Sequence, residues 1–395
     1  MPVFQGGEPG RWARGRVTES TPVSALQIPA DLLPSDGRFG CGPAKIRPEA
    51  VAALAGPGAA LLGTSHRQAP VRNLVAEVRE GLAALFDLPV GYEVVLGNGG
   101  STTFWDVAVC SLVERRSAHG SFGEFSAKFA AAAAAAPHLD EPSVLTAPVG
   151  SVAVPAAVEG ADVYAWAHNE TSTGALAPVA RVPGADPGAL VVIDGTSAAG
   201  GVAVDVGETD VYYFAPQKSL GSEGGLWLAL LSPAAVERTE RLAGSGRWIP
   251  DSLSLSLALA SSRQQQTLNT PAIATLFLLR EQLTWLLEHG GLAGAAARTA
   301  DSASRIYPWA ERSAYATPFV TEPVHRSPVV ATIDFTGVDA ARLAAALRVN
   351  GVLDTEPYRK LGRNQLRVGL FPNVDPDDVT RLCACVDWLV ERLAD

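Results

Sequence analysis

Apolar residues follow two different spacings along the chain, and each spacing predicts a different kind of element. From residue 71 to residue 86 they recur every three or four positions, which predicts a surface helix whose inner face carries Leu74, Val75, Val78, Leu82, Leu85 and Phe86. Further helices are expected to begin at Pro48 and to span 101–113, 130–136, 272–289, 339–349 and 376–393.

Short, continuously apolar runs predict buried strands at 93–96, 162–167, 190–193, 211–214 and 226–231. Because such strands have no polar face, their sheet must be covered by helices on both sides, which is typical of a mostly parallel α/β architecture. After residue 289 the pattern changes to an alternating strand at 329–335 and a short strand at 365–368, set among amphipathic helices. This change indicates a separate α+β layer.

The chain is therefore expected to have an α/β fold with two domains. Residues 51–292 would form a large domain around the parallel sheet, and residues 36–50 would join residues 293–395 in a smaller α+β domain. Residues 1–35 are expected to be a flexible N-terminal extension, because the first 25 positions are rich in Gly, Pro, Arg and Thr and show no periodicity.

The composition excludes several classes of protein. The 31 Lys and Arg residues against 41 Asp and Glu residues leave a net charge of −10 without a basic block, which argues against nucleic-acid binding. No run approaches the roughly 18 apolar residues of a membrane span, and the N-terminus lacks the apolar core of a secretory signal, so a cytoplasmic protein is expected. The four cysteines, Cys41, Cys110, Cys383 and Cys385, show no pair of C-x-x-C spacings, which argues against a zinc site or a disulfide framework. They are expected to be buried, reduced thiols.

Three stretches carry residues whose chemistry belongs together. Asp194 ends an apolar strand, at the edge where ligands bind in open α/β sheets. Lys218 follows another strand, and the Gly-rich turn 97–100 opens a helix whose free N–H groups favour an anion such as phosphate. Taken singly, these are most simply a cap or turn residue, a surface lysine and a plain turn. Together they match pyridoxal phosphate, which needs an amine for its aldehyde, a cradle for its phosphate and a carboxylate for its ring nitrogen.

Four short motifs carry a family resemblance: Asn-Gly-Gly-Ser-Thr at 98–102, His-Asn-Glu-Thr at 168–171, Asp-Gly-Thr-Ser at 194–197 and Gln-Lys-Ser at 217–219. Further matches lie at 39–44, 65–67, 269–271 and 366–369. The sequence thus resembles the phosphoserine aminotransferases, a family of class V, fold-type I pyridoxal phosphate enzymes, from about residue 36 to the C-terminus. The resemblance implies a large cofactor-binding domain with a seven-stranded, mostly parallel sheet and a smaller α+β domain.

The resemblance also implies roles for individual residues. Lys218 would form the Schiff base with the cofactor and carry the proton between the substrate and the cofactor, while Asp194 would pair with the pyridinium nitrogen. Phe125 would stack on the ring in place of the family's tryptophan. The remaining cofactor contacts would come from Gly100, Ser101, Thr102, Thr171 and Gln217, and from Asn269 and Thr270 of the neighbouring subunit of a homodimer with shared active sites.

Substrate binding is implied to rest on cations, since a phosphorylated oxo acid brings both a carboxylate and a phosphate. Arg367 would hold the α-carboxylate. His66 and Arg67, from the neighbouring subunit, would bind the substrate phosphate or the side-chain carboxylate of glutamate. Many members have a His-Arg pair before the equivalent of Arg367, where this chain has Arg359, Lys360 and Arg363.

These features predict a transaminase that converts 3-phosphohydroxypyruvate and L-glutamate to O-phospho-L-serine and 2-oxoglutarate by a ping-pong mechanism, in serine biosynthesis. A phosphorylated oxo acid of the vitamin B6 pathway is a second candidate substrate. The nearest alternative is a serine- or alanine-glyoxylate aminotransferase, which would not need the cations at 65–67. A cysteine desulfurase would need a mobile cysteine, whereas Cys383 and Cys385 lie in a helical pattern. A non-catalytic binding protein with this fold would not need Lys218 and Asp194.

Overall fold

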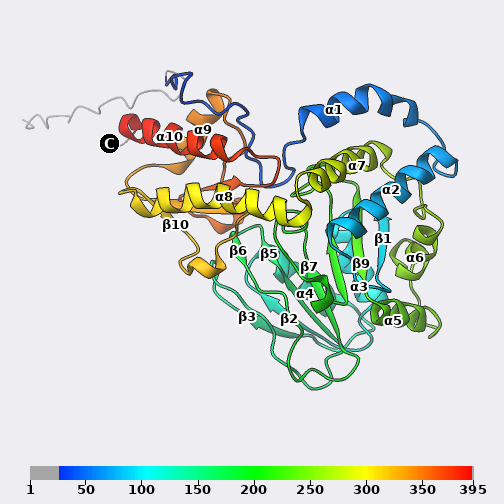
Figure 1. The fold of residues 1–395 in the computed structure, drawn as a ribbon. Helices are drawn as coiled ribbons and strands as arrows, with labels where there is room; N and C mark the ends of the chain where they lie inside the picture. The colour runs from blue at the N-terminus through cyan, green and yellow to red at the C-terminus, as the bar shows by residue number, and fades with distance from the viewer. Residues whose placement is uncertain (1–25, 394–395) are drawn as a thin grey trace, which may run out of the picture.

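The computed structural model describes residues 26–393, and its large domain is built on a seven-stranded sheet (Figure 1). The strands, in the order β1-β9-β8-β7-β4-β2-β3, are β1 (Glu93–Asn98), β9 (Leu226–Leu231), β8 (Val211–Phe214), β7 (Leu190–Asp194), β4 (Val163–Ala167), β2 (Ser117–Ser121) and β3 (Ser143–Thr146). β9 pairs antiparallel with β8 and β1, and the other neighbours pair in parallel. The prediction of a mostly parallel sheet is confirmed.

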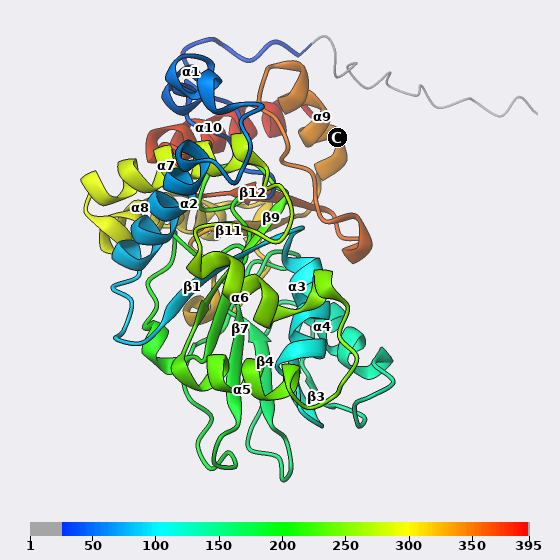
Figure 2. The ribbon, with the colours of Figure 1, turned by 90° about the vertical axis from the view of Figure 1, so that its right-hand side faces the viewer.

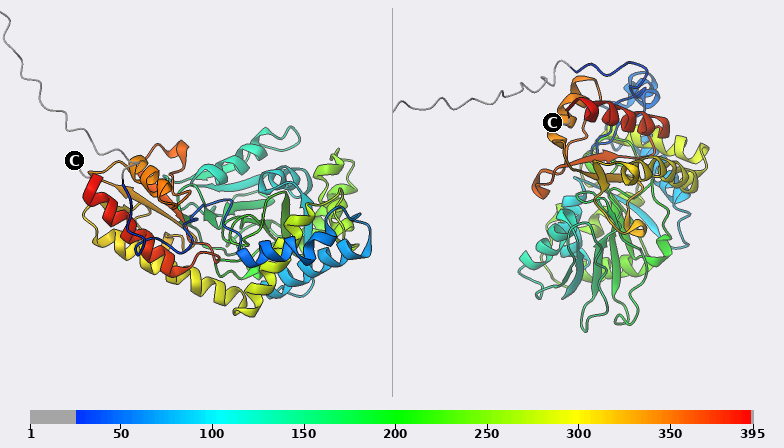
Figure 3. Two further views of the ribbon diagram at one scale, coloured as in Figure 1. Left: turned by 90° about the horizontal axis from the view of Figure 1, so that it is seen from above. Right: turned by 90° about the vertical axis from the view of Figure 1, so that its left-hand side faces the viewer.

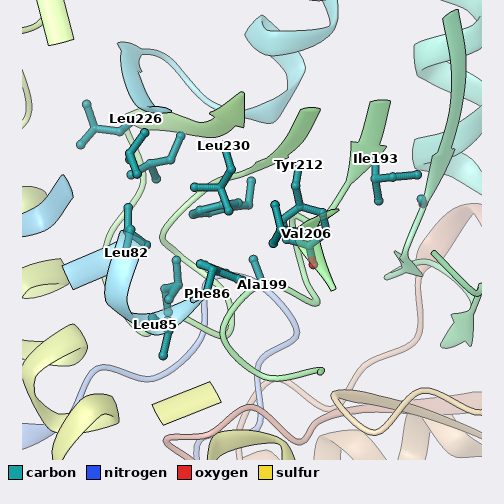
Figure 4. Packing of buried hydrophobic residues seen from close by; sticks show 14 of the residues in the cluster. Leu82, Leu85, Phe86, Ile193, Ala199, Val206, Tyr212, Leu226 and Leu230 are labelled. Carbon is teal, nitrogen blue, oxygen red and sulfur yellow. The ribbon is translucent and has the colours of Figure 1, made fainter. Parts of the chain in front are cut away.

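Helices cover both faces of this sheet, as the apolar strands require. One face packs against α2 (Ala69–Leu85) and α7 (Ile273–Glu288), and the other against α3 (Ser101–Ser111), α4 (Glu124–Ala135), α5 (Pro233–Ala243) and α6 (Leu255–Arg263). Figure 4 shows the first of these cores, where Leu82, Leu85 and Phe86 lie against Tyr212 and Leu230 of the sheet. The two strands of a short hairpin, β5 (Asn169–Glu170) and β6 (Ala175–Leu176), follow β4.

The small domain combines a three-stranded antiparallel sheet with three helices and lies above the large sheet in Figure 2. Its elements are α8 (Gly291–Arg312), β10 (Ala316–Pro318), β11 (Val330–Phe335), α9 (Ala340–Val349), β12 (Gln365–Gly369) and α10 (Pro376–Leu393). α8 and α10 run side by side along one flank (Figure 3). Short 3-10 helices complete the fold: η2 (Pro57–Leu61), η3 (Val206–Glu208), η4 (Asp251–Leu253), η5 (Pro323–His325) and η6 (Arg359–Leu361). No helix within 26–393 is both long and apolar enough to cross a membrane.

The N-terminal boundary differs from the prediction. Residues 1–25 lie outside the described residues, but Leu26 and Ile28 are buried in the small-domain core, and the Ile28 amide donates to Asn350 Oδ1 at 2.9 Å. Residues 26–35 therefore belong to the small domain and not to an extension. The expected boundary at residue 50 falls inside α1 (Pro48–Ala55), which packs on α7 of the large domain.

The first segment of the described chain also pairs with the last strand. The Gly369 amide of β12 donates to the Phe39 carbonyl at 2.8 Å, and the Leu353 amide donates to the Gly37 carbonyl at 2.7 Å. Residues 37–39 thus join β12 and the segment at residue 353 in the small domain.

The strand β2 was not predicted, because its sequence, Ser-Ala-His-Gly-Ser, contains no apolar run. All five of its residues are nevertheless buried. His119 Nε2 lies 2.9 Å from Ser117 Oγ, and its ring packs edge-on against Phe129 at 5.0 Å between centroids. A Cβ on Gly120 would stand 2.1 Å from the Ala153 carbonyl oxygen. Glycine stands at position 120 because a neighbouring chain segment passes too close for a larger residue.

The buried histidines predict how stability depends on pH. Burial lowers the pKa of His119 and that of His168 to about 4, whereas an unfolded histidine titrates near 6.5. Between these values the unfolded chain binds protons that the folded chain does not, so the free energy of unfolding falls as pH falls. In urea titrations, the free energy of unfolding of His119→Asn should depend less steeply on pH than that of the wild type. The slope should fall by up to about 1.4 kcal/mol per pH unit, which is the contribution of one proton.

The matched control for this slope is His289→Asn, at an exposed position. It should leave the pH dependence of unfolding as it is in the wild type. A His119→Asn variant with the wild-type slope would contradict a neutral, buried His119.

Candidate active site

A cavity of about 170 Å³ lies at the carboxyl ends of β1, β4, β7 and β8, where loops from these strands converge. Its lining contains the predicted residues Gly100, Ser101, Thr102, Phe125, Thr171, Asp194, Gln217 and Lys218. It also contains Trp105, Asn169 and Thr196, for which sequence reasoning gave no role. The three stretches singled out in the sequence thus meet at one place.

Lys218 holds the amine of this cavity. Its Nζ donates to the Cys41 carbonyl and to Thr171 Oγ1, both at 3.2 Å. Burial lowers the pKa of Lys218 to about 8, and the positive charge of Arg367 acts in the same direction. Gly42 has a φ of +136°, and a Cβ there would come within 2.9 Å of Nζ, so only glycine leaves room for the lysine. A substantial fraction of this amine is consequently neutral near physiological pH.

Asp194 ends β7 and is buried, which raises the pKa of its carboxyl group. The Thr196 amide donates to Asp194 Oδ1 at 2.8 Å and lowers the pKa in part. Thr196 Oγ1 in turn donates to Ser101 Oγ at 2.6 Å. Thr196 therefore connects the Asp194 carboxylate to Ser101, the residue that follows the Gly-rich turn.

The Gly-rich loop places the N-terminus of α3 at the cavity. Gly99 has a φ of +116°, and a Cβ there would stand 2.5 Å from Thr103 Oγ1, which explains the glycine. Gly100 is the N-cap residue, and no side chain within 26–393 caps the helix. The amides of its first turn, from Ser101 on, therefore remain available, and the positive end of the helix dipole favours an anion at this position.

Phe125 lies over the amine, with its ring centroid 5.4 Å from Lys218 Nζ. The buried carboxylate of Glu170 holds it in place, accepting from the amides of Phe125 at 3.2 Å and Ser126 at 2.9 Å, and from Ser172 Oγ at 2.7 Å. A carboxylate at a helix N-terminus is favoured by the dipole. Glu170 thus anchors the start of α4 and fixes the aromatic wall of the cavity.

Arg367, on β12 of the small domain, is not among the residues that line the cavity but contacts Thr171, which is one of them. Its Nη1 donates to the Thr171 carbonyl at 3.2 Å, and its guanidinium lies 5.3 Å from the ring centroid of Tyr358. Its Nε is buried without a hydrogen-bond partner among the described residues. One donor of this guanidinium is therefore left for a ligand.

Two of the three cations in segment 359–363 are engaged within the protein. Lys360 pairs with Glu124 at the start of α4, and Arg363 pairs with Asp334. Arg359 is exposed and forms no ion pair with a carboxylate in the described part of the chain. The pairing of Lys360 joins the small domain to the helix that carries Phe125.

The residues expected to serve a neighbouring subunit lie outside the cavity lining. His66 Nδ1 is 3.1 Å from Thr270 Oγ1, and Arg67 beside it is exposed. Asn98, at the end of β1, donates to the Thr270 carbonyl at 3.0 Å and accepts from the Asn269 amide at 3.4 Å. These polar groups form one surface cluster next to, but not within, the cavity of their own chain.

The sequence and fold have close counterparts among known proteins. Residues 52–354 match the family Aminotransferase class-V. A protein from a Nocardioides species named phosphoserine aminotransferase is 60% identical over 373 residues, which is 94% of this chain and 100% of that protein. A Mycolicibacterium vanbaalenii protein given the same name provisionally is 62% identical over 369 residues, covering 93% and 99% of the two chains.

Solved structures extend the comparison to the fold. A phosphoserine aminotransferase from Cytophaga hutchinsonii superposes with a TM-score of 0.81 at 22% identity, covering 89% of this chain and 99% of that one. At that identity the likeness establishes the fold alone, and it agrees with the seven-stranded sheet described above. From its match over residues 52–354 and its relatives of about 60% identity, the chain belongs to the class V aminotransferases, in the family of the phosphoserine aminotransferases.

Proposed function

We propose that the protein is a pyridoxal phosphate-dependent transaminase that converts 3-phosphohydroxypyruvate and L-glutamate to O-phospho-L-serine and 2-oxoglutarate. The observation that carries the proposal is the meeting of Lys218, Asp194 and the uncapped N-terminus of α3 at one cavity. The names of relatives about 60% identical support the choice of substrates. The four free cysteines support a reducing compartment such as the cytoplasm.

The residues of the cavity fit pyridoxal phosphate. Asn169 Oδ1 and Gln217 Oε1 are buried without hydrogen-bond partners in the described part of the chain. Buried polar atoms are normally hydrogen-bonded, so these two oxygens would accept hydrogen bonds from a bound ligand. Space for an anion is open at Gly100, where an added Cβ would meet no atom within 4 Å. The α3 amides would hold the phosphate, Asp194 the ring nitrogen and Phe125 one ring face. When bound, the cofactor supplies an aldehyde that condenses with amines and a ring that stabilises a carbanion.

Lys218 would transfer the substrate proton, and Arg367 would bind the substrate carboxylate. The lowered pKa of Lys218 favours the neutral amine at near-neutral pH, so Nζ would hold the aldehyde of the cofactor and would accept a proton from the substrate Cα. Arg367, with a free Nε, would bind the α-carboxylate and so orient the Cα–H bond toward that amine. Glutamate and the oxo acid would use this same site in turn, which predicts parallel double-reciprocal plots.

We further propose a homodimer in which each cavity is completed by the His66, Arg67, Asn269 and Thr270 cluster of the other subunit. Two observations support this arrangement. The cluster carries polar groups that its own cavity does not use, and Arg67 is exposed beside it. A phosphorylated substrate also needs a cation beyond Arg367, while Lys360 and Arg363 are paired internally.

Replacing Arg67 with alanine is expected to raise the KM for 3-phosphohydroxypyruvate roughly tenfold or more, because one charge-assisted contact to the phosphate is lost. The kcat should change little. The unphosphorylated hydroxypyruvate serves as the internal control, since its KM should not move. Arg115→Ala, at an exposed arginine near the amino end of β2, should behave as the wild type. An unchanged KM for the phosphorylated substrate would remove Arg67 from the phosphate site.

The proposed function is tested by comparing oxo acids with glutamate as the amino donor. The kcat/KM for 3-phosphohydroxypyruvate should exceed that for hydroxypyruvate roughly a hundredfold, because the phosphate-binding groups are otherwise left unpaired. The phosphorylated oxo acid of the vitamin B6 pathway is assayed beside them. A preference for glyoxylate would instead favour the glyoxylate aminotransferases.

A further inference from the structure

The two hydrogen bonds of the Lys218 amine fix the direction of its lone pair as well as its position. A neutral amine has two N–H groups and one lone pair. Both N–H groups are engaged, because Nζ donates to the Cys41 carbonyl and to Thr171 Oγ1, each at 3.2 Å. Within residues 26–393 these are the two hydrogen bonds of Nζ, so its lone pair has no donor. The lone pair is thus left for a ligand as long as Thr171 accepts from the amine.

Thr171 accepts from the amine because its own proton is used elsewhere. A threonine hydroxyl can donate as well as accept, and a proton turned toward Nζ would occupy the lone pair. Thr171 Oγ1 instead donates to Ser197 Oγ at 2.9 Å. Both side chains are buried. Ser197, which follows β7, therefore holds Thr171 in the role of an acceptor.

A backbone carbonyl sets the direction of this chain of hydrogen bonds. Ser197 Oγ donates to the Asn169 carbonyl at 3.1 Å. A carbonyl oxygen can only accept, so the single proton of Ser197 is used there and its oxygen accepts in its other contacts. One of these is with Asn169 Nδ2, at 2.7 Å, and the other is with Thr171. The chain thus runs one way, from the Lys218 amine through two hydroxyls to the carbonyl.

We propose that Ser197 is a positioning residue, whose hydroxyl holds Thr171 as a hydrogen-bond acceptor and so keeps the lone pair of the Lys218 amine available. Ser197 is not among the residues that line the cavity, and it acts through Thr171, which is. The proposal rests on the proposed function, because it assigns Ser197 to the amine that would hold the cofactor. Burial of Lys218 favours the neutral amine to which the argument applies.

The test measures the reactivity of the amine itself, by competitive labelling of the full-length apoprotein with a trace of acetic anhydride. Acetylation of each lysine peptide across pH gives the pKa of Lys218 and the limiting rate constant of its neutral form. In Ser197→Ala the Thr171 proton can turn to the lone pair, and that hydrogen bond must break before the amine attacks. The limiting rate constant is therefore expected to fall roughly fivefold, as for one neutral hydrogen bond. The pKa of Lys218 should fall as well, because the neutral form gains a hydrogen bond.

A merely structural role for Ser197 predicts changes of the opposite sign. A loosened site would admit water, which would raise the pKa of Lys218 toward its ordinary value and speed its acetylation. The matched control is Ser219→Ala, because Ser219 is an equally buried serine whose hydroxyl donates to the Ser197 carbonyl at 2.7 Å, outside the chain of hydroxyls. It should leave the labelling of Lys218 as in the wild type. The exposed Lys128 should label alike in every variant.

Thr171→Val removes the hydroxyl that could turn, so in that background Ser197→Ala should not lower the limiting rate constant further. Ser197→Cys, whose thiol accepts only weakly, should act as Ser197→Ala does and replaces it if that variant fails to fold. An unchanged or higher limiting rate constant in the Ser197 variant would overturn the proposal. The labelling needs no cofactor, so a wild-type protein that does not bind pyridoxal phosphate would instead overturn the proposed function.

Discussion

Lys218→Ala is expected to lower the rate of transamination at least about 10⁴-fold, because the variant loses both the attacking amine and the group that moves the substrate proton. Among the cavity-lining residues of the described chain, Lys218 carries the one amine. Initial rates with glutamate and 3-phosphohydroxypyruvate measure the effect. Lys128→Ala, on the exposed side of α4, should retain the wild-type rate.

The fold of this variant should survive. Lys218 donates two hydrogen bonds of 3.2 Å, to Cys41 and Thr171, and its burial disfavours the charged amine. Removing it therefore relieves a desolvation cost while leaving two acceptors with one donor fewer. Urea unfolding should give a free energy of unfolding close to that of the wild type. Transamination by the pure Lys218→Ala protein would show that another group carries the chemistry.

Asp194→Asn is expected to reduce kcat roughly 10²- to 10³-fold, because an amide cannot supply the negative charge that the ring nitrogen requires. The amide oxygen can still accept from the Thr196 amide, so the loop geometry should persist. Asp205→Asn, at an exposed residue that caps η3, is the control and should keep its activity. A kcat within a factor of two of the wild type would separate Asp194 from the reaction.

Stability should move in the opposite direction to activity in the Asp194→Asn variant. Burial raises the pKa of Asp194, so ionising it in the folded protein costs free energy at every pH above the ordinary value near 3.8. The neutral amide of the variant carries no such cost, and its gain in stability should appear as pH rises from that value through the raised pKa. A joint loss of activity and stability at neutral pH would point to a structural role for the carboxylate.

The sequence predicted best those strands and helices in which a single spacing of apolar residues extends over the whole element. The apolar strands β7, β8 and β9 and the helices α2 and α10 lie where periodicity placed them, within a few residues. The strand β2 has no such pattern, and a close chain segment requires glycine at position 120. Pro308 and repeated Gly, Ala and Ser obscure α8, a helix of 22 residues that packs against α10.

For the site, local motifs indicated the residues that come from the carboxyl ends of single strands, such as Asp194 and Lys218. The contacts that tune them were not predictable in the same way. The Cys41 carbonyl, which accepts from Lys218, lies 177 residues before it in the chain. The pairing of Lys360 with Glu124 joins positions 236 residues apart. Such partners are set by strand order and domain packing, which a single sequence does not display.

The pairing of residues 37–39 with 353 and 369 has a consequence for the order of folding. The loop that accepts a hydrogen bond from Lys218 at Cys41 is held in place by β12, which follows Lys218 and the strands of the large sheet in the chain. Arg367 lies on that same strand. The large sheet can form without β12, but the surroundings of the amine are incomplete until β12 has paired with residues 37–39. We therefore expect the site around Lys218 to form only when the small domain has folded.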